Sequence, residues 1–474
     1  MTREIRQILS LLGVCVCLTG IARAGDVTRT YDEQLRVRLD QQAPGVSGTS
    51  IDGGGWFSTA IFKYDDASAD RFRTLRKHEL RLWGAASYQG VHSGYFRVMT
   101  GYEDWNSGDN PFGHGDEYND FEFERAWYQL DVAALLGRAS GDEQPHQLRL
   151  RAGRQLIELG TGLAMTMPLD AVRIEAEICD LEIMGLIGRS IDDYPNIDES
   201  QAVYSHQDRW FWGVQAKYNG FRDHSIFAYY LSNYDMTDPK EPDPVSRAVQ
   251  DYDYTSQYIG VGSVGQLVLP NLRYQLEVVG EMGRTHSYLS GPHEDQDDIC
   301  AWAMDAQLAY YFTELPMRPK VWAQYLYASG DSDRRTSTTS TIQGNRQGTT
   351  DYAFNGFGFR DTGLSYFPDI SNLQMWQVGG SFFPLEKFHW AKDMEVGTKV
   401  FFYAKADGAG PTDDTTIDNP GSRYLGWEWD AYIDWRITTD VSLTVRYGAF
   451  FPGAAYSDND SCRQFVYAAL TYSF

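Results

Sequence analysis

Short segments in which polar and apolar residues alternate recur along almost the whole chain. In the last one, "FVYAALTYSF" at 465–474, Tyr472 and Phe474 fall on one face and Thr471 and Ser473 on the other. Because side chains alternate between the two faces of a strand, the pattern predicts β-structure. We predict about 18 strands, an even number within the range of bacterial membrane barrels. They are 55–63, 76–88, 94–104, 121–133, 147–156, 171–178, 180–189, 208–218, 223–232, 253–265, 271–283, 300–312, 319–328, 374–384, 393–405, 424–437, 441–450 and 464–474.

The connections between these segments alternate in length. If both termini lie on one side, the connections on the far side, such as 190–207 and 329–373, are long and mostly rich in Asp, Gly, Ser and Thr. Those on the near side are short, for example 438–440, with 134–146 and 385–392 of intermediate length. Outer-membrane barrels combine short periplasmic turns with long extracellular loops, whereas a soluble β-sandwich has no reason to sort its loops in this way. The sequence therefore predicts an all-β protein, a single antiparallel transmembrane β-barrel.

The N-terminus has the layout of a secretory signal. Arg3 and Arg6 precede an apolar run over 8–22, and Ala22-Arg23-Ala24 follows. This order predicts a signal peptide over residues 1–24. Its removal takes away three Arg and one Glu, which leaves 450 residues and changes the net charge from −24 to −26. No later segment has the roughly 18 consecutive apolar residues of a spanning helix.

After the signal peptide we expect two parts. Residues 55–474 are predicted to form the barrel, and residues 25–54 a periplasmic N-terminal segment or an extra strand. Together these features predict a location in the outer membrane of a Gram-negative-type cell envelope. Cys179, Cys300 and Cys462 remain after cleavage, so at most one disulfide can form, and whether Cys300 and Cys462 pair stays open.

The two faces of the predicted strands differ in charge. In 171–178, Val172 and Ile174 oppose Arg173 and Glu175. A second strand follows the same rule, with Leu425, Trp427, Trp429, Ala431, Ile433 and Trp435 opposing Glu428, Asp430, Asp434 and Arg436. A charge facing mid-bilayer lipid costs about 2–4 kcal/mol, so the apolar face must meet lipid and the charged face a wet lumen.

Four segments resemble the alginate-export porin family. They are "LRLRAGRQ" at 148–155, "ISNLQMWQVGGSF" at 370–382, "GWEWD" at 426–430 and "VRYGAFFPGAAY" at 445–456. The likeness follows the strand order from about residue 55 to the end of the chain. It implies an 18-stranded outer-membrane barrel that passes an anionic exopolysaccharide. The long periplasmic loop that acts as a plug in such proteins has no counterpart here, because the turn at 438–440 is short.

The resemblance implies a lumen lined by arginines that meet sugar carboxylates, together with some acidic residues. The residues that fit are Arg81, Arg97, Arg151, Arg154, Arg173, Arg273, Arg360, Arg446, Glu428 and Asp430. Strict alternation from Leu148 points Arg154 at lipid, so Arg154 needs either a bulge at Gly153 or a place at the membrane interface. Guanidinium groups bind carboxylates bidentately, and many weak contacts let a polymer slide. The alternative is that each arginine pairs with a neighbouring carboxylate of the wall.

Three functions stay open. The first is export of an anionic, alginate-like exopolysaccharide by passive, loop-gated passage, with periplasmic polysaccharide-secretion proteins as partners. The second is a passive porin for small solutes, and the third an outer-membrane enzyme. No HExxH or GxSxG motif is present, so we expect no enzyme. We expect no cofactor and no nucleic-acid partner, and contact with outer-membrane lipid or lipopolysaccharide. A surface Ca²⁺ ion at Asp-rich loops such as 407–422 stays an alternative, although no loop has a complete ligand spacing.

Overall fold

The computed structural model describes residues 48–66, 71–110, 115–140, 146–191, 197, 207–237, 253–288, 296–334, 337–339, 344–414, 416–456 and 461–474. The predicted signal peptide and the possible strand within 25–47 lie outside these residues. The strands are β1 (Thr49–Asp66), β2 (Arg71–Tyr88), β3 (His92–Trp105), β4 (Glu117–Asp131), β5 (Gln147–Glu158), β6 (Thr166–Ile178), β7 (Leu181–Arg189), β8 (Arg209–Phe221), β9 (His224–Asp235), β10 (Tyr254–Gln266), β11 (Leu272–Tyr288), β12 (Gln296–Tyr311), β13 (Lys320–Ala328), β14 (Asn345–Arg346), β15 (Leu373–Phe382), β16 (Met394–Ala404), β17 (Tyr424–Arg436), β18 (Val441–Pro452) and β19 (Arg463–Ser473).

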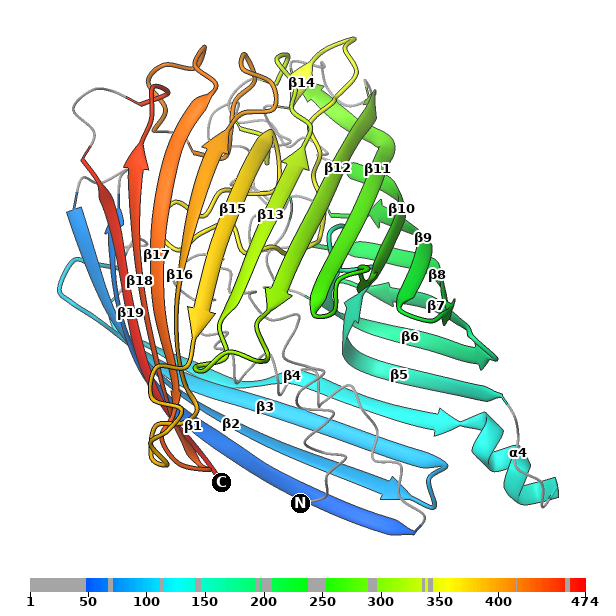
Figure 1. Cartoon of the computed structure of the whole chain (residues 1–474). Coiled ribbons are helices and arrows are strands. Elements are labelled where there is room, and N and C mark those ends of the chain that lie inside the picture. The colour runs from blue at the N-terminus through cyan, green and yellow to red at the C-terminus, as the bar shows by residue number, and fades with distance from the viewer. Residues whose placement is uncertain are drawn as a thin grey trace.

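These strands form one sheet that closes on itself (Figure 1). Neighbours in sequence pair antiparallel around the sheet, and β1 pairs with both β2 and β19. Trp56, for example, lies opposite Arg81 on one side and Ser473 on the other. The exception is β14, a two-residue strand inside the β13–β15 connection that runs parallel to the end of β11. The predicted antiparallel barrel is confirmed, because the other eighteen strands form a closed cylinder without a free edge.

Each of the eighteen predicted segments coincides with one strand of the barrel wall. The structure adds details that alternation does not encode. β1 begins at Thr49, before the predicted boundary at residue 55. A helix, α4 (Val132–Ser140), occupies the connection predicted over 134–146, and Asp131 Oδ1 accepts a hydrogen bond of 2.8 Å from the Ala134 N–H at its start. Within the described ranges, no helix has the length and apolar character needed to cross a membrane.

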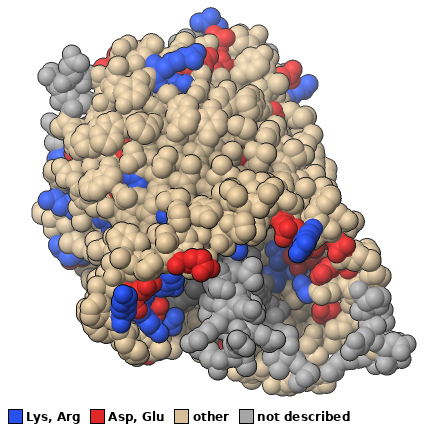
Figure 2. Space-filling model, viewed as in Figure 1, with Lys and Arg blue, Asp and Glu red and all other residues tan. Residues whose placement is uncertain are grey.

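The outer face of the wall is apolar, as predicted. Val172 and Ile174 are exposed on β6, whereas Arg173 between them is buried. In the view of Figure 2 the middle of the molecule consists largely of uncharged residues, and most charged side chains gather toward its two ends. This is the distribution that a lipid-facing band requires, since charges are tolerated near the membrane surfaces and not at its centre.

One predicted outward-facing residue is wrong. Leu425 was assigned to the lipid side with Trp427, but it is fully buried. The register between β16 and β17 shifts next to Tyr403, which lies opposite Gly426, whereas Ala404 lies opposite Tyr424. Gly426 has a φ of +140°, and this bulge turns Leu425 inward.

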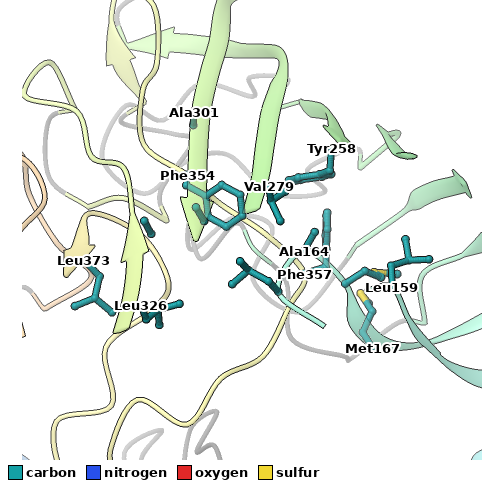
Figure 3. Close-up of a cluster of buried hydrophobic side chains, with 14 of the residues drawn as sticks. Leu159, Ala164, Met167, Tyr258, Val279, Ala301, Leu326, Phe354, Phe357 and Leu373 are labelled. Carbon is teal, nitrogen blue, oxygen red and sulfur yellow. The ribbon is translucent and has the colours of Figure 1, made fainter. Parts of the chain in front are cut away.

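The lumen contains an apolar core in addition to its charged wall. Two connections fold inward: the short inner loop (residues 159–165, between β5 and β6) and the long inner loop (residues 344–372, between β13 and β15). Figure 3 shows Phe354 and Phe357 of the long inner loop near Val279 of the wall and Ala164 of the short inner loop. The lumen is therefore partly filled with dry, packed side chains, which corrects the expectation of a bore that is wet throughout.

Candidate functional site in the barrel lumen

A row of five buried arginines follows the lumen face of five neighbouring strands, β2 to β6. We call Arg81, Arg97, Arg125, Arg151 and Arg173 the basic row. Cross-strand register brings its members together: Arg97 lies opposite Arg125 in β4, and Arg151 lies opposite Arg173 in β6. All five side chains are buried. Four of them were predicted from the sequence, and Arg125 was missed.

The basic row is paired with side chains of its own strands. Arg81 Nε lies 3.1 Å from Glu124, and Arg97 Nε lies 2.8 Å from the same carboxylate. Arg173 lies 3.1 Å from Glu175. The neutral amide of Gln129 holds Arg151, accepting hydrogen bonds of 2.9 and 2.6 Å, and the ring of Trp127 lies 4.1 Å from the Arg151 guanidinium. These pairs match the alternative in which wall carboxylates engage the arginines.

Glu124 reaches the lumen because of a bulge. In the β3–β4 ladder Arg97 pairs with Arg125, but Val98 pairs with Phe123, so Glu124 is the extra residue. An extra residue turns two consecutive side chains toward the same side, which strict alternation forbids. Glu124 and Arg125 could therefore not both be assigned to the lumen from period two. The available signal was the pair of adjacent charges, Glu124 and Arg125, which breaks the alternation of the strand.

Arg154 lies on the outer face. Ala152 and Val172 are directly opposite each other, and Arg154 and Asp170 follow two residues further along the same face. Arg154 donates to both oxygens of Asp170, at 2.9 and 3.0 Å. Gly153 has a φ of +122°, yet the β5–β6 register stays regular through Arg154. Arg154 therefore keeps the lipid-side parity of Leu148 and does not join the lumen.

Arg273 and Arg446 face the lumen away from the basic row. Arg446 on β18 donates to both carboxylate oxygens of Asp434, at 2.7 and 2.9 Å, and is buried. Arg273 lies near the start of β11, where its guanidinium is 5.8 Å from the ring of Tyr311. The predicted arginines thus do not converge on one point.

Arg360 fastens the long inner loop to the wall strands β11 and β12. Its Nε lies 2.6 Å from Asp305 on β12, and its Nη2 lies 3.3 Å from Glu277 on β11. Nη2 also donates to the Thr161 hydroxyl of the short inner loop at 2.8 Å. Burial acts to lower the pKa of Arg360, but the two carboxylates outweigh it and raise the pKa above the ordinary value. The guanidinium therefore stays charged and joins both inner loops to the wall.

Glu428 and Lys399 hold the next part of the long inner loop. Glu428 accepts backbone hydrogen bonds from Leu364 and Ser365 at 2.6 Å each and from Tyr366 at 2.8 Å. Lys399 forms an ion pair with Asp361 of the loop.

Asp430 was predicted beside Glu428, and the structure places it there. It is buried and lies opposite both Lys399 and Gly448 in the register of the wall. Of these two predicted acids, Glu428 is the one that holds the backbone of the long inner loop through hydrogen bonds.

Two glycines allow close contacts of the inner loops, Gly160 in the short inner loop and Gly358 in the long inner loop. Gly160 has a φ of +61°, and a Cβ there would lie 2.5 Å from Glu277 Oε1. A Cβ at Gly358 would collide with the carbonyl of Leu163, so the two inner loops touch backbone to backbone. Thr166 N–H also donates to the Phe357 carbonyl at 2.8 Å. Only glycine fits at either position.

A polar cavity of about 240 Å³ lies where the basic row ends, beside the short inner loop. Arg173 and Glu175 of β6 form one wall, and Glu182 and Lys217 lie across from them. Phe227 supplies an aromatic surface. The cavity thus offers charged groups of both signs next to an aromatic ring.

Among the residues that the structure describes, no group of three or more potential metal ligands was found. Cys179, Cys300 and Cys462 are free thiols. The row offers guanidinium groups to an anionic molecule along one wall, and the two inner loops narrow the lumen beside it.

Comparison with known proteins gives the same architecture. OccK5 (OpdH) of Pseudomonas aeruginosa superposes with a TM-score of 0.53 at 10% identity, covering 89% of this chain and 98% of that one. OccK11 (OpdR) gives 0.52 at 11% identity, with 90% and 96% covered. The outer membrane protein opdK of the same species gives 0.52 at 8% identity, with 90% and 98% covered. At this identity the likeness concerns the fold alone. A search of curated proteins gave no match.

The family comparison is more specific. The model of the alginate export family matches residues 195–465, which is more than half of the chain. The matched part contains the long inner loop and the strands that hold it. The chain therefore belongs to the alginate export family.

Proposed function

We propose that this protein is an outer-membrane export channel for an anionic, alginate-like exopolysaccharide. The observation that carries the proposal is the basic row, five arginines on adjacent strands of one lumen wall. Guanidinium groups bind carboxylates bidentately, and a series of moderate contacts favours sliding over trapping. Family membership supports the same class of cargo.

The pairing of the row with wall carboxylates is compatible with transport. Glu124 and Glu175 hold the arginines in fixed positions. A sugar carboxylate therefore replaces a wall carboxylate at an arginine that is already in place. Arg151 is held by the neutral amide of Gln129 and lies against the ring of Trp127. The cavity beside Arg173 then lies at one end of the path.

In this proposal the long inner loop is the gate. It lies in the lumen, packs through Leu364 near Leu75 of β2, and is held by Asp305, Glu277 and Glu428. The long loops lie outside the cell, and the short turns and both termini lie in the periplasm, where secretion proteins deliver the polymer. The channel carries out no chemistry on its cargo.

Planar-bilayer conductance with added oligouronates tests the proposal. Replacing Arg151 and Arg173 together by Gln should weaken the block about tenfold, which corresponds to roughly 1.4 kcal/mol. The matched control is the double change R154Q and R189Q, which removes the same charge from the outer face, where both arginines pair with aspartates. If both double variants lose the oligouronate block equally, the basic row is not the path of the polymer. A wide wild-type current without block by oligouronates favours a passive porin for small solutes instead.

A further inference from the structure

Three connections at the short-turn end expose large apolar side chains. They are 267–271 between β10 and β11, 312–319 between β12 and β13, and 383–393 between β15 and β16. We call their six most exposed apolar residues the apolar foot: Val268, Leu269, Leu315, Met317, Phe388 and Trp390. Val268 is fully exposed, and Trp390 is 59% exposed.

Hydrogen bonds join the three connections of the foot side by side. Asn271 Nδ2 donates to the Thr313 hydroxyl at 3.0 Å, which links the first connection to the second. Phe383 N–H donates to the Met317 carbonyl at 2.8 Å, and Arg318 donates to the Lys392 carbonyl at 3.3 Å, which link the second to the third. Fixed turns of this kind present their apolar side chains together.

Three other turns at the same end are polar at their surface. Residues 89–91, in which Val91 is buried, connect β2 to β3, Arg222 and Asp223 connect β8 to β9, and 437–440 connects β17 to β18. The β4–β5 connection differs, because α4 exposes Leu135 and Leu136. The foot combines three apolar turns from β10 to β16, and exposed apolar patches of this kind mark contact surfaces.

The foot is continuous with the lipid-facing wall. The Trp390 ring lies 5.8 Å from the ring of Trp435, and Trp435 Nε1 donates to the Trp390 carbonyl at 3.4 Å. Trp435 shares the outward parity of Trp429, which is exposed on the outer face of β17. Trp390 therefore lies on the lipid side of the rim and not over the lumen.

Cations accompany the apolar side chains. Lys387 and Lys392 are exposed on either side of Phe388 and Trp390, and the Arg318 side chain, 52% exposed, lies 3.7 Å from Glu386. Aromatic and apolar residues mixed with Lys and Arg are typical of segments that lie in the headgroup layer of a membrane.

We infer that the apolar foot inserts into the headgroup layer of the membrane leaflet at the short-turn end and binds phospholipid there. The inference rests on the membrane location in the proposed function, but it does not depend on the cargo. It extends the contact with lipid beyond the strand ends between β10 and β16. The polar turn at 437–440 stays in water.

Spin-label accessibility in liposomes of phosphatidylethanolamine and phosphatidylglycerol tests the inference. In a background with Cys179, Cys300 and Cys462 replaced by Ser, single labels are placed at V268C and F388C, with T439C in the polar turn 437–440 as the matched exposed position. The first two labels should be more accessible to oxygen than to a water-soluble nickel chelate. The Thr439 label should show the reverse.

A fourth label at I174C, on the outer wall, reports whether the barrel is in the membrane. If it contacts lipid while the Val268 and Phe388 labels are as accessible to the chelate as the Thr439 label, the inference is wrong and a periplasmic protein becomes the candidate partner. If the Ile174 label is also in water, the proposed membrane channel fails with it. The oligouronate block is measured separately, so the two failures remain distinct.

Discussion

The two halves of the lumen wall use the same polar-inward alternation for different purposes. On β2 to β6 the basic row pairs with Glu124, Glu175 and Gln129, all from the same strands. On β11, β12 and β17 the inward acids Glu277, Asp305 and Glu428 bind a loop that is distant in sequence. Inward charge alone therefore does not identify a pore lining. The partner of the charge distinguishes a wall whose charges pair within it from a wall that holds an inner loop.

The largest effect is expected at Arg360. R360M leaves the buried Asp305 and Glu277 without their shared cation, and removing one partner of a buried pair costs about 3–5 kcal/mol. We expect the long inner loop to detach and single-channel conductance to rise, with frequent switching between levels. R346M in the same loop is the control, because the Arg346 side chain is 68% exposed. Unchanged conductance of R360M would show that the loop does not obstruct the path.

A smaller change is expected at Glu428, which also anchors the long inner loop. In E428Q, an amide NH₂ replaces one of the two carboxylate oxygens that accept hydrogen bonds from the backbone N–H groups of residues 364–366. The NH₂ group then faces other donors, and an unsatisfied buried donor costs about 1–3 kcal/mol. Hydrogen exchange at these amides should become faster, while exchange in the wall strands stays the same. E395Q on β16 is the matched control. Faster exchange in both variants would indicate general loosening of the wall.

A substitution in the basic row should change ion selectivity instead of the position of the long inner loop. R97Q removes one cation but leaves Glu124 paired with Arg81 at 3.1 Å. We expect the reversal potential in a salt gradient to shift toward cation selectivity, without the level switching expected for R360M, since charged side chains in a pore set its selectivity. R154Q, on the outer face, should leave the potential unchanged. A gating change in R97Q would mean that the two walls are not separate in function.

The smallest effect is expected at the rim, where Asp414 holds the β16–β17 connection to Arg463 at 2.8 Å. Burial acts to raise the pKa of Asp414, but Arg463 and hydrogen bonds from Thr416 outweigh it, so the pKa lies below the ordinary 3.8. A carboxyl with a depressed pKa stabilises the fold above its unfolded pKa and loses that contribution as the pH falls through its folded pKa. Proteolysis of this loop should therefore increase below about pH 4.

D414N serves as the control for the rim. Because it cannot titrate, its cleavage rate should be higher at neutral pH and nearly constant down to acidic pH. If cleavage of the wild-type loop does not depend on pH, ionisation of Asp414 does not stabilise the loop.

Much of the lumen could be assigned from period two. Arg81, Arg97, Arg151, Arg173 and Arg446 face inward as predicted, because their strands are regular at those positions. The assignments failed at bulges: Leu425 turned inward, and Glu124 and Arg125 share one face. A bulge depends on the register with a neighbouring strand, which a single segment does not contain.

The sequence by itself determined the barrel, its eighteen wall strands and the side on which the long connections lie, because alternation and loop length are local properties of the chain. Tertiary structure alone decided that two of those connections fold inward and which charges they meet. Arg360 and Thr161, which share a hydrogen bond, are 199 residues apart. No local pattern specifies such a pair, since it forms only when the closed wall brings both loops into one small volume.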